Sequence, residues 1–385
     1  MARYRKALVC LFAGLLLAGA PAAAAPPTDN KARAAILMDA RTGEILYEKS
    51  SRERNAPAST TKIMTAILAL ESGRLDDPVR VSLRAAATRG SSMHLFAGQI
   101  ITLRELITGL LMRSGNDAAV AIAEHLAGSA EAFVVKMNLR ARDLGALSTQ
   151  FRNPHGLSAP GHYSSAYDLA ILARYALANP AFAAIVSSKE ISIDWLDRRG
   201  REKDVNLRNT NKLLWMLEEA DGVKTGTTGE AGPCLVSSAT RGNHKLIAVV
   251  LHDHARWYDS MQLLKYGFDN YDLYEYCDQG ALIATLPVEG GLAAEVDAVA
   301  ANPAALTIAA ADYAKVSAEV DMPKTIRAPV YQGQKVGEIV FFVGDKAVKT
   351  VDIVAAREVS ERTVLKTFLQ GLIRTFRLLA GWGVL

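Results

Sequence analysis

The 385-residue sequence has little of several features that would indicate a functional class directly. Its 44 lysines and arginines are nearly balanced by 40 aspartates and glutamates, and the net charge of +4 does not indicate nucleic-acid binding. It has no metal-ligand spacing such as H-E-x-x-H and no glycine-rich phosphate loop, so we expect neither metal nor cofactor. Five of the seven histidines are expected to be surface or loop residues: His94, His155, His162, His252 and His254.

Cysteine is also scarce, with three residues in the chain. Cys10 lies in an N-terminal segment that we expect to be removed, so the mature protein keeps Cys234 and Cys277. Export would permit a disulfide between them. However, one falls in a predicted strand and the other at a predicted domain junction. We therefore expect two buried free thiols.

Residues 1–24 have the parts of a secretory signal peptide. The basic start MARYRK precedes the apolar run ALVCLFAGLLLAGA, which is too short for a comfortable membrane span. Small residues follow in PAAAAPP, and cleavage after Ala24 avoids a proline immediately past the cut. We expect an exported protein, and the alternative is an uncleaved anchor.

Residues 25–275 are expected to form one α+β domain. The composition, 50% hydrophobic and 22% charged, is typical of a folded protein of two or more domains. Periodicity and turn residues predict, in order, a hairpin over 33–50, a helix over 59–73, two helices over 102–128, a helix over 164–179, strands over 221–252 and a helix over 257–271. The hairpin and the later strands should join in one antiparallel sheet flanked by helices.

The pattern changes after residue 276. Short apolar runs separated by glycine and proline predict a small β-rich domain over 276–356. Residues 357–385 fit an amphipathic helix, with a basic face that includes Arg362 and Arg374 opposite an apolar face that includes Phe368. We expect this helix to lie in an anionic membrane interface. The alternative is a helix packed on its own β domain.

Ser59 and Lys62 stand three residues apart at the start of the predicted helix over 59–73, in APASTTKIMTA. Such a pair projects from nearly the same helix face, so the amine can reach the hydroxyl. Desolvation and nearby positive charge lower the pKa of a lysine, which can then activate a serine as a nucleophile. Alone, the pair also fits an N-cap serine and a solvated lysine.

Ser114-Gly115-Asn116 interrupts the helical block over 102–128. A short break of this kind can direct two side chains into a cleft. The Ser114 hydroxyl could relay a proton between Lys62 and a leaving group, and the Asn116 amide could hold a substrate carbonyl and contact Lys62. Alone, the tripeptide would be interpreted as an interhelix turn.

Lys224-Thr225-Gly226-Thr227 lies on a predicted strand. Gly226 has no side chain, so an extended peptide can approach and pair with the strand edge. Lys224 and Thr225 could bind a carboxylate. The backbone N–H groups of Thr227 and Ser59 could form an oxyanion hole.

Together the three motifs match the set S-x-x-K, S-D-N and K-T-G of class A β-lactamases and penicillin-binding proteins, with S-G-N as the middle element here. With SSMHLFAGQ, NPHGLSAPGHYSSAYDLA and NTNKLL, the chain resembles the low-molecular-mass penicillin-binding proteins that are D-alanyl-D-alanine carboxypeptidases, of the type of penicillin-binding protein 5. The resemblance covers nearly the whole chain. It implies a β-lactamase/DD-peptidase-like antiparallel sheet flanked by helices, then the β-rich domain and anchoring helix.

The resemblance implies a serine peptidase that removes the terminal D-alanine from peptidoglycan stem pentapeptides. Ser59 would be the acylated nucleophile and Lys62 its base, while Ser114 and Asn116 would shuttle protons and orient substrate. Penicillin would bind covalently at Ser59, making β-lactam antibiotics inhibitors. The terminal helix would hold the enzyme on the periplasmic face of the cytoplasmic membrane.

The same resemblance assigns substrate-binding residues. Lys224 and Thr225 would hold the terminal carboxylate of D-alanine, and Arg256, just after the last strand, would assist. For Arg256 a merely solvated charge is the alternative. Some family members carry histidine after K-T-G, where this chain has Thr227, so its substrate preference could differ.

Three other functions remain as alternatives. A class A β-lactamase would need a glutamate in an E-x-x-L-N motif, and the nearest segment, EKDVN over 202–206, comes far too late. A non-hydrolysing penicillin sensor or wall-binding module would not need the full set of proton-transfer groups. An endopeptidase that cuts peptide cross-links is poorly separated from the carboxypeptidase by sequence alone.

Overall fold

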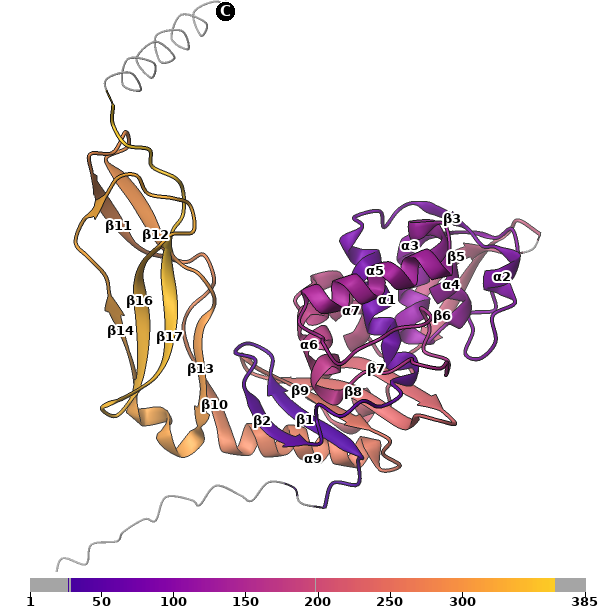
Figure 1. Ribbon diagram of the computed structural model, residues 1–385. Helices are drawn as coiled ribbons and strands as arrows, with labels where there is room; N and C mark the ends of the chain where they lie inside the picture. The colour runs from indigo at the N-terminus through magenta and orange to yellow at the C-terminus, as the bar shows by residue number, and fades with distance from the viewer. Residues whose placement is uncertain (1–26, 28, 198, 364–385) are drawn as a thin grey trace, which may run out of the picture.

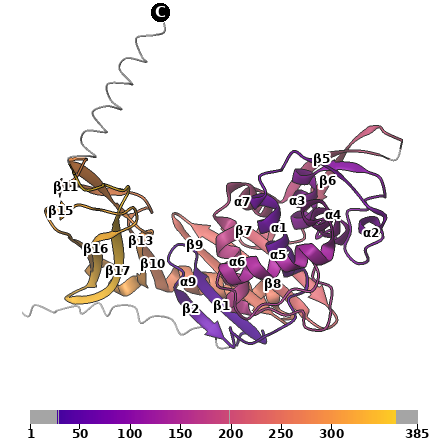
Figure 2. The same ribbon diagram turned by 45° about the horizontal axis from the view of Figure 1, so that its top comes forward.

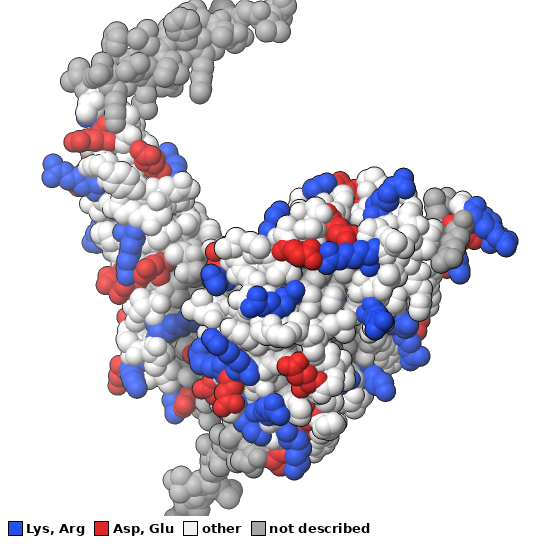
Figure 3. Space-filling model, turned by 45° about the vertical axis from the view of Figure 1, so that its right-hand side comes forward, with Lys and Arg blue, Asp and Glu red and all other residues white. Residues whose placement is uncertain are grey.

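The structure is a computed structural model that describes residues 27, 29–197 and 199–363. The predicted signal peptide and residues 364–385 of the predicted terminal helix lie outside the described residues. Two domains follow one another along the chain, a larger mixed domain and then a β-rich domain (Figure 1 and Figure 2). On the face drawn in Figure 3, basic and acidic side chains are interspersed over both.

The larger domain is built on a five-stranded antiparallel sheet of order β2-β1-β9-β8-β7. Its strands are β1 (Ala34–Asp39), β2 (Ile45–Lys49), β7 (Ala220–Thr228), β8 (Gly232–Arg241) and β9 (His244–Leu251). The N-terminal hairpin joins the later strands through the pairing of β1 with β9, which confirms the predicted single sheet. β7 is an edge strand of this sheet.

Helices cover both faces of the sheet. The helices of the larger domain are α1 (Lys62–Glu71), α2 (Leu83–Ala86), α3 (Leu103–Met112), α4 (Asn116–Ala127), α5 (Ala130–Asp143), α6 (Ala166–Leu177), α7 (Pro180–Ser187), α8 (Leu213–Met216) and α9 (Arg256–Asn270). Successive side chains of a strand face opposite sides. Accordingly Ile36 and Met38 pack in the helical core, whereas Ala35 and Leu37 pack in the core that includes α9. No single described helix is both long and apolar enough to cross a membrane.

Two small hairpins complete the larger domain. β3 (Pro78–Arg80) pairs with β4 (Ile100–Thr102), and β5 (Glu190–Leu196) pairs with β6 (Glu202–Arg208). The predicted helical block over 102–128 is broken as expected, because α3 ends at Met112 and α4 begins at Asn116. Thr102 and Glu105 form a capping box at the start of α3.

The second domain is β-rich, as predicted. β10 (Tyr271–Cys277) pairs with β13 (Ala304–Ala309) beside a six-stranded sheet of order β14-β16-β17-β12-β11-β15. The strands of that sheet are β11 (Leu282–Glu289), β12 (Glu295–Ala300), β14 (Val316–Asp321), β15 (Ile326–Arg327), β16 (Lys335–Val343) and β17 (Lys346–Ala355). Its core includes Phe341, Ile339 and Ile353, all fully buried.

The predicted helix over 357–385 does not begin at residue 357. Residues 357–363 are not helical; Val359 bridges to Val330, and Glu361 bridges to Gly291. Val359 is 2% exposed, so its burial against the β-rich domain overrides the helical periodicity of the sequence.

The tip of the β1–β2 hairpin contacts the β-rich domain. Arg41 forms ion pairs with Glu275 and Asp278. The hydroxyls of Thr42 and Thr307 lie 2.6 Å apart. These contacts fix one end of the five-stranded sheet to the β10–β13 pair.

Cys234 and Cys277, the two cysteines within the described residues, are free thiols, as expected. Cys234 is fully buried in β8, and burial raises the pKa of its thiol to about 11. Cys277 is only half-buried, because it lies at the end of β10. The expectation of two buried thiols therefore holds for Cys234 alone.

The β-rich domain should depend on Phe341 for its stability. Replacing this fully buried ring in Phe341→Ala removes apolar contacts and leaves a cavity, which should cost about 3–5 kcal/mol. Thermal unfolding of the purified protein measures the loss. Tyr331→Ala is the control, because Tyr331 is 62% exposed in the same domain and should change stability by less than about 0.5 kcal/mol. Equal stability of the two variants would contradict this account of the core.

Candidate active site

Ser59 and Lys62 meet where a short 3₁₀ turn, η1 (Ala58–Thr61), leads into α1. Ala58 has a φ of +48°, a left-handed conformation that is rare outside glycine. Lys62 is fully buried, and its Nζ lies 2.9 Å from the Ser59 Oγ. Ser59 lies inside η1 and is not an N-cap residue, since the N-caps of η1 and α1 are Pro57 and Thr61. The alternative of an N-cap serine beside a solvated lysine is therefore wrong.

The Lys62 amine has two further partners, and both are uncharged oxygens. Nζ lies 2.7 Å from the Asn116 Oδ1 and 2.6 Å from the backbone carbonyl of His155. A neutral amine has two N–H groups and one lone pair. If the N–H groups donate to these two oxygens, the lone pair is left to accept the hydroxyl proton of Ser59.

The surroundings of Lys62 favour this neutral form. Burial lowers the pKa of Lys62 well below its ordinary value, and the positive charge of Lys224 lowers it further. Asp117 acts in the opposite direction and raises the pKa. The arrangement can therefore supply a base next to a serine hydroxyl.

The break between α3 and α4 presents Asn116 and Ser114 at this centre. Asn116 donates from Nδ2 to the carbonyl of Arg89 at 2.7 Å, which orients its Oδ1 toward Lys62. Ser114 has a φ of +61° and is 5% exposed. Within the described part of the chain, its buried Oγ has no hydrogen-bond partner. The hydroxyl is thus free to exchange a proton with a bound molecule.

The third motif runs along the edge strand β7, beside η1. An added Cβ at Gly226 would lie 2.9 Å from the Ser59 nitrogen, so this close approach needs glycine. Lys224 is 1% exposed, and its amine has one long contact, 3.3 Å to the Thr225 carbonyl. Burial, with a contribution from the charge of Arg256, lowers the pKa of Lys224 to about 7. Thr225 shares a hydrogen bond with Thr210.

Arg256, the first residue of α9, lies against the same strand. Its Nη1 donates to the Gly226 carbonyl at 2.8 Å and to the Thr227 Oγ1 at 3.0 Å. It also contacts the Cys234 carbonyl at 3.2 Å. The guanidinium is thus held beside the K-T-G segment, which argues against the alternative of a merely solvated charge.

Two histidines contribute in ways that the sequence analysis did not predict. His162 is 5% exposed rather than at the surface. Its Nδ1 accepts from the Arg152 N–H, so its Nε2 carries the proton and donates to the Thr61 hydroxyl at 2.9 Å. Thr61 in turn donates to the Ala58 carbonyl at 2.8 Å. This series of hydrogen bonds supports the left-handed backbone conformation of Ala58, the residue before Ser59.

His155 acts through its backbone carbonyl, and its half-buried ring accepts from the Leu157 N–H. Burial lowers the pKa of the ring to about 3, so it is neutral. The segment NPHG that contains His155 is part of the resemblance described above. The sequence could not identify the His155 carbonyl as an acceptor, because every residue type carries a backbone carbonyl.

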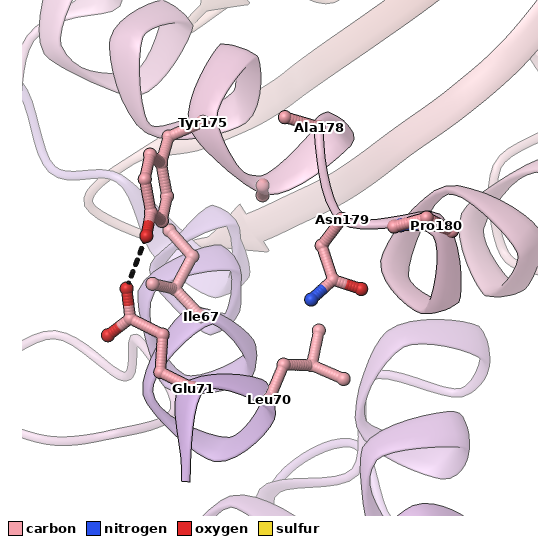
Figure 4. Close-up of a pocket in the computed structure, with 8 residues that line it drawn as sticks. Ile67, Leu70, Glu71, Tyr175, Ala178, Asn179 and Pro180 are labelled. Carbon is pink, nitrogen blue, oxygen red and sulfur yellow. Dashed lines mark hydrogen bonds between the residues drawn. The ribbon is translucent and has the colours of Figure 1, made fainter. Parts of the chain in front are cut away.

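A separate pocket of about 290 Å³ lies toward the other end of α1 (Figure 4). Its lining includes Ile67, Leu70, Glu71, Tyr175 and residues 178–180, and the Tyr175 hydroxyl donates to the Glu71 carboxylate at 2.6 Å. None of the motif residues lines it. The motif geometry, rather than this pocket, therefore identifies the candidate active site.

The chain matches two known domain families in succession. Residues 20–255 match the D-alanyl-D-alanine carboxypeptidases of peptidase family S11, and residues 271–361 match the C-terminal domain of penicillin-binding protein 5. The D-alanyl-D-alanine carboxypeptidase DacF of Bacillus subtilis is 39% identical over 350 residues, 89% of each chain. DacC of Escherichia coli is 36% identical over 372 residues, 92% of this chain and 90% of its own.

Solved structures agree with these matches. Penicillin-binding protein 5 of Haemophilus influenzae superposes with a TM-score of 0.73 at 32% identity, covering 88% of this chain and 100% of its own. The Streptomyces K15 DD-transpeptidase superposes with a TM-score of 0.61 at 34% identity, covering 64% of this chain and 100% of its own. With its two domains and its three motifs so matched, the chain belongs to the D-alanyl-D-alanine carboxypeptidases of peptidase family S11, a family of serine hydrolases.

Proposed function

We propose that this enzyme removes the terminal D-alanine from peptidoglycan stem pentapeptides through an acyl-enzyme on Ser59. The observation that supports this most directly is the Lys62 amine, buried between two uncharged oxygens with Ser59 as its third partner. A lysine so placed can take the hydroxyl proton without first losing one of its own to solvent.

In the acylation step, Ser59 Oγ bonds to the carbonyl carbon of the scissile peptide while Lys62 takes its proton. The backbone N–H groups of Ser59 and Thr227 would bind the developing oxyanion. The C–N bond then breaks, and the proton held by Lys62 passes through the Ser114 hydroxyl to the departing amine of D-alanine, which leaves Lys62 neutral again. Water attacks the resulting ester, which releases the shortened peptide and restores the Ser59 hydroxyl. A β-lactam ring would be opened by the same attack, which accounts for the covalent penicillin binding typical of this family.

Substrate recognition falls to the β7 edge. In its charged form Lys224 would bind the terminal carboxylate of D-alanine together with the Thr225 hydroxyl. Arg256, at the start of α9, would add positive charge beside Gly226. The peptide would run along β7 beside Gly226, where no side chain obstructs it. Asn116 would hold a substrate carbonyl.

The proposal includes a location outside the cytoplasm. The composition of residues 1–24 fits a signal peptide, and the basic and apolar faces of the segment after residue 363 fit a membrane-surface helix. The enzyme would then work on the periplasmic face of the cytoplasmic membrane, peripherally anchored, where its substrate is found.

The roles of Ser59 and Lys62 can be tested by substitution. Ser59→Ala should abolish both D-alanine release from a D-Ala-D-Ala peptide and covalent labelling by penicillin. Lys62→Ala should slow acylation by about 10²–10⁴-fold with the fold intact, because the general base is lost. Stopped-flow acylation and an assay of free D-alanine measure these effects. Ser72→Ala, at the other end of α1, is the matched control and should label normally.

Labelling of Ser59→Ala at the normal rate would show that another nucleophile is used. A cross-linked peptide dimer tested in parallel separates the carboxypeptidase from the endopeptidase, which would cleave the dimer and leave the pentapeptide intact.

The charge of Lys224 predicts a pH dependence. Because the pKa of this amine is about 7, it loses its positive charge as the pH rises through that value, and carboxylate binding should weaken. The kcat/KM of the normal enzyme should therefore fall on the alkaline side. Lys224→Arg keeps its charge and should move that fall to higher pH. Lys224→Ala should raise KM about 10- to 100-fold at pH 6, and an unchanged KM there would rule out this role.

Membrane attachment can be tested by deleting the C-terminal segment. The deletion should begin after Thr363, because the bridges of Val359 and Glu361 belong to the β-rich domain. The protein without residues 364–385 should sediment with the soluble fraction and keep its D-alanine release. The full chain should bind vesicles that contain anionic lipid. Retention of the truncated protein on membranes would contradict the proposed anchor.

A further inference from the structure

Asp117 follows the S-G-N motif directly, yet nothing in the proposed reaction uses it. Its side chain is fully buried in the first turn of α4. A buried carboxylate is costly unless it is compensated by hydrogen bonds. The partners of Asp117 therefore show what its charge is used for.

The carboxylate of Asp117 is satisfied mainly by one neighbouring segment. Its oxygens accept from the Ser92 hydroxyl at 2.6 Å, from the Met93 N–H at 3.0 Å and from the Leu95 N–H at 3.1 Å. The Ala118 N–H adds a fourth donor at 3.0 Å. All of these donors are uncharged hydroxyl or backbone N–H groups, and three of them belong to residues 92–95.

The same segment holds Asn116. The carbonyl of Arg89 accepts from the Asn116 Nδ2 and the carbonyl of Ser91 accepts from its N–H, both at 2.7 Å. With Nδ2 held in this way, the Asn116 Oδ1 is directed at the Lys62 amine. Hydrogen bonds shorter than 3.2 Å thus join Asp117 to residues 92–95, and others join Asn116 to residues 89 and 91 and to Lys62. The backbone of residues 89–95 links the two sets.

We propose that Asp117 is a positioning residue for acylation, because its buried carboxylate fixes residues 89–95, which in turn fix Asn116. Through Asn116, the Lys62 amine is held against the Ser59 hydroxyl. The charge of Asp117 also acts on Lys62 directly, as the nearby anion that opposes its loss of a proton. This inference rests on the proposed role of Lys62 as the base.

The titratable groups that face Lys62 come from three parts of the chain, and two of them are charged. Lys224 on β7 lowers the pKa of Lys62, and Asp117 on α4 raises it. The His155 ring, in the loop after α5, is neutral because its pKa is about 3. Removing the charge of Asp117 should therefore lower the pKa of Lys62. Since the neutral amine is the active form, the acid limb of the pH–kcat/KM profile should move to lower pH.

The test compares Asp117→Asn with two other variants of the full-length enzyme. Asp117→Asn should reduce kcat/KM for a D-Ala-D-Ala peptide about 10- to 100-fold, because a displaced Asn116 misplaces the base, and should shift the acid limb to lower pH. Asp168→Asn is the matched control. Asp168 is also a buried carboxylate, 3% exposed, that accepts from the Ser148 N–H and the Thr149 hydroxyl. It should lose stability without moving the acid limb.

Ser92→Ala separates the two effects of Asp117. It removes one donor to the carboxylate but no charge, so acylation should slow while the acid limb stays in place. An unmoved acid limb in Asp117→Asn, or its full activity, would overturn the inference. If Asp117→Asn does not fold, acylation of Ser92→Ala at the normal rate would overturn it. Failure of the proposed base role of Lys62 is detected separately. In that case Lys62→Ala would be acylated at the normal rate.

Discussion

The desolvation of one amine sets the requirements for the rest of the catalytic domain. Lys62 is buried completely, and its two firm partners are a side-chain amide and a peptide carbonyl. A carboxylate in either place would stabilise the ammonium form and remove the base. The fold must therefore bring two uncharged acceptors from distant parts of the chain to one nitrogen. The break before α4 supplies Asn116, and the loop after α5 supplies the carbonyl of His155.

A second buried lysine, Lys224, must keep its positive charge, whereas Lys62 must lose it. Lys224 is buried as deeply as Lys62, but the pKa of its amine, about 7, leaves a substantial charged fraction near neutral pH. Two ammonium groups in one low-dielectric site repel each other, so the charge of Lys224 favours the neutral form of Lys62. A bound carboxylate would stabilise the charge on Lys224. Pairs of groups whose environments move their pKa values apart are typical of sites with separate acid, base and binding roles.

The sequence was sufficient for the features that depend on residue type and periodicity. It predicted the single sheet, the break between α3 and α4, the β-rich domain and the motif residues that now lie around Ser59. It failed where the backbone or tertiary packing decides. The acceptor at His155 is a peptide carbonyl, which any residue could supply. The burial of His162 depends on its bond to Thr61, 101 positions earlier, and the strand-like course of 357–363 depends on the pairing of Val359.

The position of Asp117 shows how a site can contain an anion and still keep a neutral lysine. The carboxylate is one residue beyond Asn116, and its hydrogen bonds go to the segment around Met93 rather than to the amine. Direct contact would hold Lys62 equally firmly but would keep it protonated. The Asp117 carboxylate positions Lys62 indirectly, through backbone N–H groups and the Asn116 amide. Its charge acts on Lys62 only by a longer-range electrostatic interaction. Rigid placement and low basicity of the amine are thereby obtained from different groups.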